Sequence, residues 1–131
     1  MLMSVFDSKN LEATMTPAPS RSRHPSQDVL RGTLDLLILK ALSLEPMHGW
    51  AIAQRLEQLS RDALQVGQGS LYPALHRMEE KGWIDSEWKS TAENRRAKYY
   101  ELTPTGRRAH ERETESWRRY VDMVELILQT T

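Results

Sequence analysis

Residues 69–84, GSLYPALHRMEEKGWI, have the pattern of one amphipathic helix followed by its stop signal. Apolar residues recur in this stretch at intervals of three and four, and such residues share one face of a helix. They are Leu71, Ala74, Leu75 and Met78. Glycine is favoured just beyond a helix C-terminus because it accepts the left-handed backbone conformation found there. We therefore expect a helix that ends before Gly82.

The polar residues of this helix point away from the core if the apolar stripe faces it. Serine, tyrosine, histidine and arginine side chains can donate hydrogen bonds to DNA phosphates or base edges, and proline is tolerated near the start of a helix. The candidate DNA-contacting residues are Ser70, Tyr72, Pro73, His76 and Arg77. Periodicity alone fits an ordinary amphipathic helix with a solvated polar face equally well.

Two further helices are predicted upstream of this stretch. The first stops at Pro46, and a turn at His48 and Gly49 leads into the second, which runs from about Gly49 to Ser60. The inward face of the first consists of Leu34, Leu37, Ile38, Ala41 and Leu42. The inward face of the second consists of Ile52, Leu56 and Leu59. The short segment 64–66, apolar at its ends, predicts a strand before the next helix.

Downstream of the helix the pattern changes to a period of two. Residues 83–89 alternate, and the side chains predicted to share one side are Ile84, Ser86 and Trp88. Residues 97–102 include Tyr99 and Tyr100, which favour a strand and which we expect to be structural. The polar segment 90–96 between these stretches predicts the loop of a β-hairpin.

A long final helix is predicted from Thr103-Pro104, a typical helix start, to about Leu128. With about 25 residues it would reach roughly 37 Å, too long to pack wholly against so small a domain. Its apolar positions keep a spacing of three and four to the end of the chain. They are Trp117, Tyr120, Val121, Val124, Ile127 and Leu128. A second copy of the chain is the simplest partner for this stripe.

The order helix, helix, short strand, helix, hairpin and long helix predicts a mainly α fold. We expect a winged helix-turn-helix domain, with three helices and a β-hairpin wing, over residues 28–103, and a C-terminal dimerisation helix over residues 104–131. Residues 1–27 are rich in proline and serine and predict a flexible arm. The arm is either an inert extension or one that touches DNA phosphates through Arg21 and Arg23.

Several segments together resemble the PadR family of bacterial transcriptional regulators, over about residues 30–128. They occur in the family's order: RGTLDLLILKAL, HGWAIAQRL, GSLYPALHRMEEKGWI and AENRRAKYYELTPTGRRA. The single C-terminal helix is similar to that of the short-tailed branch of the family. One departure is Gly67-Gln68, which stands where many relatives have Ser-Pro at the start of the third helix.

The resemblance implies a dimeric DNA-binding repressor whose third helices and wings bind a pseudo-palindromic operator in double-stranded DNA. It makes Tyr72, the tyrosine of the LYP motif, a contact to the DNA backbone, with Ser70, His76 and Arg77 beside it. The expected wing contacts are Asn94, Arg95, Arg96 and Lys98. The cations among them could neutralise phosphates or reach into a minor groove, and the alternative is a solubilising loop.

Trp117 lies in a Glu-Ser-Trp context that is similar to that of drug-sensing relatives, in which the tryptophan faces its twin across the dimer. That similarity implies an effector site for a planar aromatic small molecule. The alternative is a tryptophan of the dimer core that binds no ligand. The residues assigned to this effector or dimer interface are Trp117, Tyr120, Val121, Val124 and Leu128.

Other functional classes find little support. The chain has no cysteine, its four histidines lie far apart, and it has no nucleophile or phosphate-loop motif, so we expect no catalytic residues, metal or cofactor. No apolar run could span a bilayer, and we expect a soluble cytoplasmic protein. An alternative function is a winged-helix protein–protein interaction module that does not read DNA.

The net charge of zero, from 18 basic and 18 acidic residues, at first argues against DNA binding. The charges are unevenly distributed, however. Within residues 89–98, four cations oppose Glu93 alone, whereas the final helix balances five basic against five acidic residues. A basic wing on a neutral protein predicts modest, salt-sensitive affinity for DNA in general.

Overall fold

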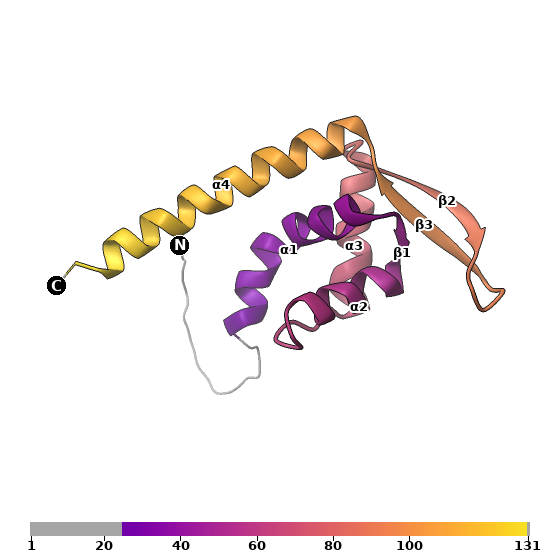
Figure 1. Cartoon of the computed structure of the whole chain (residues 1–131), viewed down its shortest axis with the longest axis horizontal. Helices are drawn as coiled ribbons and strands as arrows, with labels where there is room; N and C mark the ends of the chain where they lie inside the picture. Colours follow the sequence, from indigo (N-terminus) through magenta and orange to yellow (C-terminus); the bar gives the residue numbers. More distant parts are fainter. Residues whose placement is uncertain (1–24, 131) are drawn as a thin grey trace. The chain divides into compact units, whose positions relative to one another are not determined.

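The computed structural model describes the backbone of residues 25–130 and the side chains of residues 33–130 (Figure 1). Residues 1–24 of the expected arm, including Arg21 and Arg23, lie outside the described residues. The chain consists of two compact units, and the boundary between them falls between Gly32 and Thr33. The unit from Thr33 onward contains most of α1 (Pro25–Leu44) and every later element. The expected domain boundaries after residues 27 and 103 stay predictions.

Helices α2 (Gly49–Leu59) and α3 (Gln68–Glu80) follow α1 and form the helix-turn-helix. His48 caps α2, because its Nδ1 accepts a hydrogen bond from the backbone N–H of Ala51 at 3.2 Å. Helix α3 begins after Gly67, which offers no side-chain cap. At its end the N–H of Trp83 bonds the carbonyl of Met78 while Gly82 adopts a φ of 77°. These contacts form the glycine-terminated helix end that the sequence predicts.

The sheet has three antiparallel strands in the order β1-β3-β2 (Figure 1). Strands β2 (Ile84–Ser90) and β3 (Arg96–Leu102) form the wing, with Ile84 opposite Leu102 and Ser90 opposite Arg96. Strand β1 (Met47–His48) pairs with Tyr100 and Tyr99 at the other edge of β3. The sheet thus ties the start of α2 to the wing.

Helix α4 (Pro104–Leu128) starts at a crowded junction with the base of the wing. Thr103 caps α4 by accepting a hydrogen bond from the N–H of Gly106, and its hydroxyl also donates to the carbonyl of Gly82 at 2.6 Å. A Cβ on Gly106 would collide with the carbonyl oxygen of Trp83. Glycine is therefore required at residue 106 for this close approach. None of the helices in the described part of the chain is long and apolar enough to cross a membrane.

The core confirms the predicted stripe of α3, whose four apolar members are all buried. Two predictions about the upstream helices were wrong in detail. Leu59 is 55% exposed, because α2 ends there and the chain turns at Arg61 and Asp62, both at positive φ. Four of the five residues predicted for the inward face of α1 are buried, but Leu37 is only half-buried, and Leu39, outside the predicted set, is fully buried.

The predicted strand at residues 64–66 was also wrong. Those residues form a loop, and the small strand of the fold is β1, where the sequence predicted only a turn. Segment 64–66 has no strand beside it, whereas Met47 and His48 lie along the free edge of β3. A two-residue strand depends on the edge it pairs with, not on its own pattern.

Candidate nucleic-acid interface

The exposed face of α3 holds all five residues predicted from its spacing. Ser70, Tyr72, Pro73, His76 and Arg77 are each exposed. Pro73 is the sixth residue of α3, further into the helix than a favoured helix-start position. Because proline has no N–H, the carbonyl of Gly69 lacks its usual helical donor. The first turns of α3 therefore expose polar side chains and also leave one backbone acceptor without its helical donor.

Tyr72 is held by a glycine on the preceding helix. A Cβ on Gly49 would lie 2.7 Å from the Tyr72 hydroxyl and 2.9 Å from two of its ring carbons, so any larger residue would push the ring out of this position. The ring packs against the first turn of α2 and remains 42% exposed. The HGW and LYP motifs, distant in sequence, thus combine to fix the position of one tyrosine.

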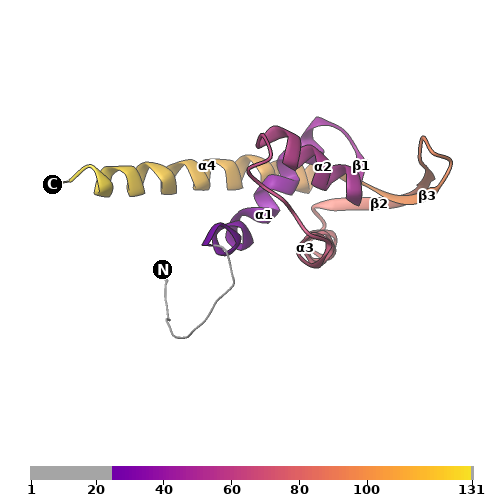
Figure 2. The same ribbon diagram turned by 90° about the horizontal axis from the view of Figure 1, so that it is seen from below.

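The wing presents one of its faces toward α3. Directly opposed residues of an antiparallel pair lie on the same face, and the register places Trp88 opposite Lys98 next to the pair Ser90–Arg96. The Arg96 guanidinium lies 5.4 Å from the centre of the Trp88 ring. The other face holds Tyr99, with Lys89 over its ring at 5.5 Å. Figure 2, in which α3 is viewed nearly along its axis, shows the wing extending to one side of that helix.

The tip of the wing is a tight turn that ends in a left-handed residue. Asn94 has a φ of 62°, its N–H bonds the carbonyl of Thr91, and the N–H of Thr91 bonds the carbonyl of Arg95. Asparagine is one of the few residues that adopt this conformation readily. The structure therefore gives Asn94 a turn-forming role, and it leaves both Asn94 and Arg95 exposed.

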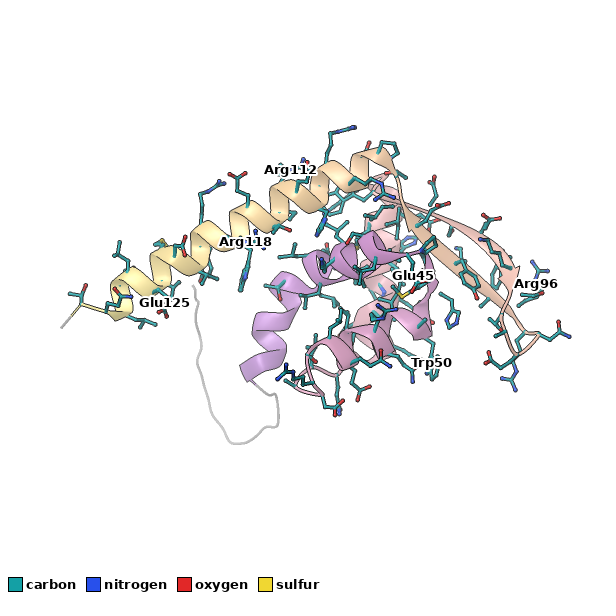
Figure 3. All side chains as sticks on the ribbon, viewed as in Figure 1. Glu45, Trp50, Arg96, Arg112, Arg118 and Glu125 are labelled. Atoms are coloured by element: carbon teal, nitrogen blue, oxygen red, sulfur yellow. The ribbon has the colours of Figure 1, made fainter. Side chains whose placement is uncertain are left out.

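A groove of about 1030 Å³ lies between the wing and the N-terminal ends of α2 and α3. Its aromatic lining consists of His48, Trp50, Tyr72, Trp88 and Tyr100, and its charged lining of Arg95, Arg96, Lys98 and Glu93. Figure 3 shows Trp50 at the end of α2 nearest the wing, and Arg96 on the wing itself. The sequence did not single out Trp50 or Trp88, although they are 61% and 58% exposed.

Glu79 connects α3 to the wing. Its carboxylate accepts a hydrogen bond from Ser86 Oγ at 2.6 Å and lies 3.9 Å from Lys98 Nζ. Burial raises the pKa of the Tyr100 hydroxyl, and the neighbouring Glu79 and Tyr72 raise it further. Tyr100 therefore keeps its proton and serves as a neutral support beneath the groove.

The predicted arginine, lysine and histidine contacts fall into two groups. Arg77 lies 3.0 Å from Asp35 of α1, Lys98 is paired with Glu79, and His76 Nε2 lies 3.4 Å from Glu80. Within residues 33–130, neither Arg95 nor Arg96 has a carboxylate within ion-pair distance. The two wing arginines are therefore the predicted cations that a phosphate could engage without displacing an acidic partner.

A second groove, of about 820 Å³, lies between α1 and α4 and is mostly apolar. Trp117 and Val121 line it, whereas Tyr120, Val124 and Leu128 do not. The rings of Trp117 and Tyr120 are 5.9 Å apart. Burial lowers the pKa of His110 in this groove, and the positive charge of Lys40 lowers it further, while Glu111 opposes the shift.

Among the side chains that the structure describes, no cluster of three or more histidine or acidic residues could hold a metal ion. Residues 38–112 match the family described as "Transcriptional regulator PadR-like family". A transcriptional regulator of Mycobacterium tuberculosis, Rv3488, is 37% identical over 79 residues, which cover 60% of this chain and 70% of that protein.

Solved structures agree with this match. A PadR family transcriptional regulator from Eggerthella lenta is 30% identical, with a TM-score of 0.69 over 81% of this chain and 90% of that one. A PadR-like transcriptional regulator from Bacillus cereus is 29% identical, with a TM-score of 0.68 over 79% of this chain and 99% of that one. In both cases the share of this chain that is covered is larger than the winged helix alone.

Proposed function

The chain belongs to the PadR-like family of transcriptional regulators, and we propose that it is a homodimeric repressor that reads a pseudo-palindromic operator. The family and its structural relatives are regulators, not enzymes. The observation that carries the proposal is the groove flanked by the exposed face of α3 and by two wing arginines that have no acidic partner within residues 33–130. In each half-site α3 would enter the major groove, and Tyr72, Arg95 and Arg96 would contact the backbone.

Arg96→Ala is expected to weaken binding to operator and unrelated duplexes alike, on the order of tenfold at moderate salt. The slope of log affinity against log salt should become shallower by about 0.9 per wing, because one phosphate contact is lost from each. Fluorescence anisotropy with a duplex from the gene's own upstream region, titrated at several salt concentrations, measures both quantities.

Lys89→Ala is the matched control for Arg96→Ala. It removes the same charge from the same hairpin, but Lys89 lies over Tyr99 on the other face of the wing and does not itself line the groove. Its salt slope should stay close to that of the wild type. Equal slopes for the Arg96 and Lys89 variants would remove Arg96 from the set of phosphate contacts.

The exposed apolar surface of α4 supports the homodimer. Seven large apolar residues of this helix are at least 36% exposed: Trp117, Tyr120, Val121, Met123, Leu126, Ile127 and Leu128. A surface of this kind marks an interaction site, and the groove between α1 and α4 would accept the same helix from a second copy. Two reading helices joined in this way would lie about 34–36 Å apart, one turn of DNA.

We also propose that a planar aromatic effector binds at Trp117. Trp117 is 38% exposed and lies in the apolar groove beside Lys40, and its ring is tilted against that of Tyr120. An indole face of this kind can stack on a flat ligand. Binding there would shift the separation of the two reading helices and so lower the affinity for the operator.

Trp117→Phe is expected to abolish most of the tryptophan quenching that a planar aromatic cation such as ethidium causes in the wild-type protein without DNA. The substitution is needed because the chain has four tryptophans. Steady-state fluorescence titration of both proteins measures the difference. Identical quenching curves would show that the ligand binds elsewhere.

A protein–protein module without DNA reading remains the alternative function. Exposed aromatic residues at the wing favour it, because they also suit a protein interface. Retardation of the upstream duplex by the wild-type protein distinguishes the two functions. Failure to bind any such duplex, together with a stable protein partner in a pull-down, would favour the module.

A further inference from the structure

The groove between the wing and α2 has a lining that the reading helix alone does not explain. Trp50 and Trp88 are both more than half exposed, and neither contributes to the buried core. They come from α2 and from β2, yet they line the same groove as Tyr72 of α3. Two large exposed indoles at one concave surface indicate a site that is covered when the protein acts.

The geometry of a winged helix on DNA identifies what would cover it. When α3 enters the major groove and the wing lies over the adjacent minor groove, the backbone strand that separates the two grooves must pass between helix and wing. In this protein the space between the wing and the N-terminal ends of α2 and α3 is the groove lined by Trp50, Tyr72 and Trp88.

We infer that this groove holds one DNA backbone strand, with Trp50 and Trp88 against its deoxyriboses and Arg96 on its phosphates. The inference rests on the proposed DNA-binding function. The lining has both chemistries that a backbone strand requires: cations at Arg95, Arg96 and Lys98 against the single acid Glu93, and apolar ring faces between them. The carbon atoms of the sugar would cover the indoles, while the phosphates would meet the guanidinium groups.

Trp88 has a second role in this arrangement as a positioning residue for Arg96. The guanidinium lies 5.4 Å from the ring centre, where an aromatic face attracts a cation. Because Arg96 has no acidic partner among the described side chains, the indole is its remaining restraint. The stacked arginine is held on the groove side of the wing before any phosphate arrives.

Protection of the tryptophans from a neutral quencher tests the inference directly. Acrylamide quenching is measured with and without the upstream duplex for Trp50→Phe/Trp88→Phe and for the matched double variant Trp83→Phe/Trp117→Phe. The second variant retains only the two groove tryptophans, and DNA should protect most of its fluorescence. The first variant retains only Trp83 and Trp117, which do not line the groove, and DNA should leave its quenching nearly unchanged.

Anisotropy titrations separate the two roles. Trp50→Ala should weaken binding about three- to tenfold with an unchanged salt slope, because it removes an uncharged contact. Trp88→Ala should weaken binding and also make the slope shallower, because Arg96 loses its restraint. Circular dichroism confirms that each variant is folded.

The outcomes distinguish this inference from the function on which it rests. If the wild type binds duplex DNA while Trp50 and Trp88 stay open to acrylamide, the backbone follows another path and only the inference fails. Wild-type affinity in both alanine variants would overturn it in the same way. If the wild type binds no duplex at all, the proposed function fails as well.

Discussion

Gly106→Ala is expected to lower the free energy of unfolding by about 1–3 kcal/mol, toward the upper end of that range. The added Cβ would collide with the carbonyl oxygen of Trp83, lie 2.9 Å from its carbonyl carbon and lie 3.3 Å from Leu102 Cδ2. The obstacle is backbone at the base of the wing, so a side-chain rotation cannot relieve it. Differential scanning calorimetry should show a Tm lower by roughly 10 °C.

Gly69→Ala is the matched control for this substitution. Gly69 is also in the first turn of a helix, but nothing lies within 4 Å of its added Cβ. Alanine there should be neutral or should stabilise the protein by about 0.5–1 kcal/mol, because it favours the helix. If the two variants melted at the same temperature, the tight junction between the wing and α4 would be contradicted.

Val121→Asp is expected to convert the protein into a monomer and to reduce operator affinity by about 10²–10⁴-fold. Val121 lies in the groove between α1 and α4, so the variant would place a carboxylate from each copy in an apolar interface. A monomer binds one half-site only and loses the gain in affinity that comes from linking two reading heads. Light scattering measures the mass, and anisotropy measures the affinity.

Met123→Asp tests whether the effect is specific to the groove. Met123 is an exposed apolar residue on the same helix, but it does not line the groove. Because Met123 belongs to the exposed apolar surface of α4 but lies outside the groove, its variant should weaken the dimer and the operator affinity less than Val121→Asp does. A dimeric Val121→Asp protein would show that the copies associate through some other surface.

The sequence predicted the large elements of the fold because each has its own local signal. The stripe of α3, the Gly82 stop and the Thr103-Pro104 start all occur where predicted, since periodicity and capping act over a few residues. The short strand was predicted in the wrong place because the signal for it lies outside its own residues. Strand β1 exists only because the edge of β3 is beside it, and no pattern within Met47–His48 could reveal that edge.

In the candidate site, too, local features could be predicted and tertiary contacts could not. Helical spacing correctly predicted which α3 residues are exposed, but it could not show that Arg77 meets Asp35 or that Lys98 meets Glu79. Those partners lie far along the chain. Trp50 and Trp88 were missed because each looks unremarkable in its own segment, and only the tertiary fold places both in one groove.

The junction at Thr103 and Gly106 also determines how the protein could transmit a signal. No flexible linker separates the wing from α4, because Thr103 bonds both the base of the wing and the first turn of the helix. In a dimer held together by α4, this helix would behave as a rigid rod about 37 Å long, with its N-terminal end fixed to the winged helix. A rotation of a few degrees where the two α4 helices cross would move each winged helix by several ångströms. The two α3 helices would then no longer match successive major grooves of the DNA.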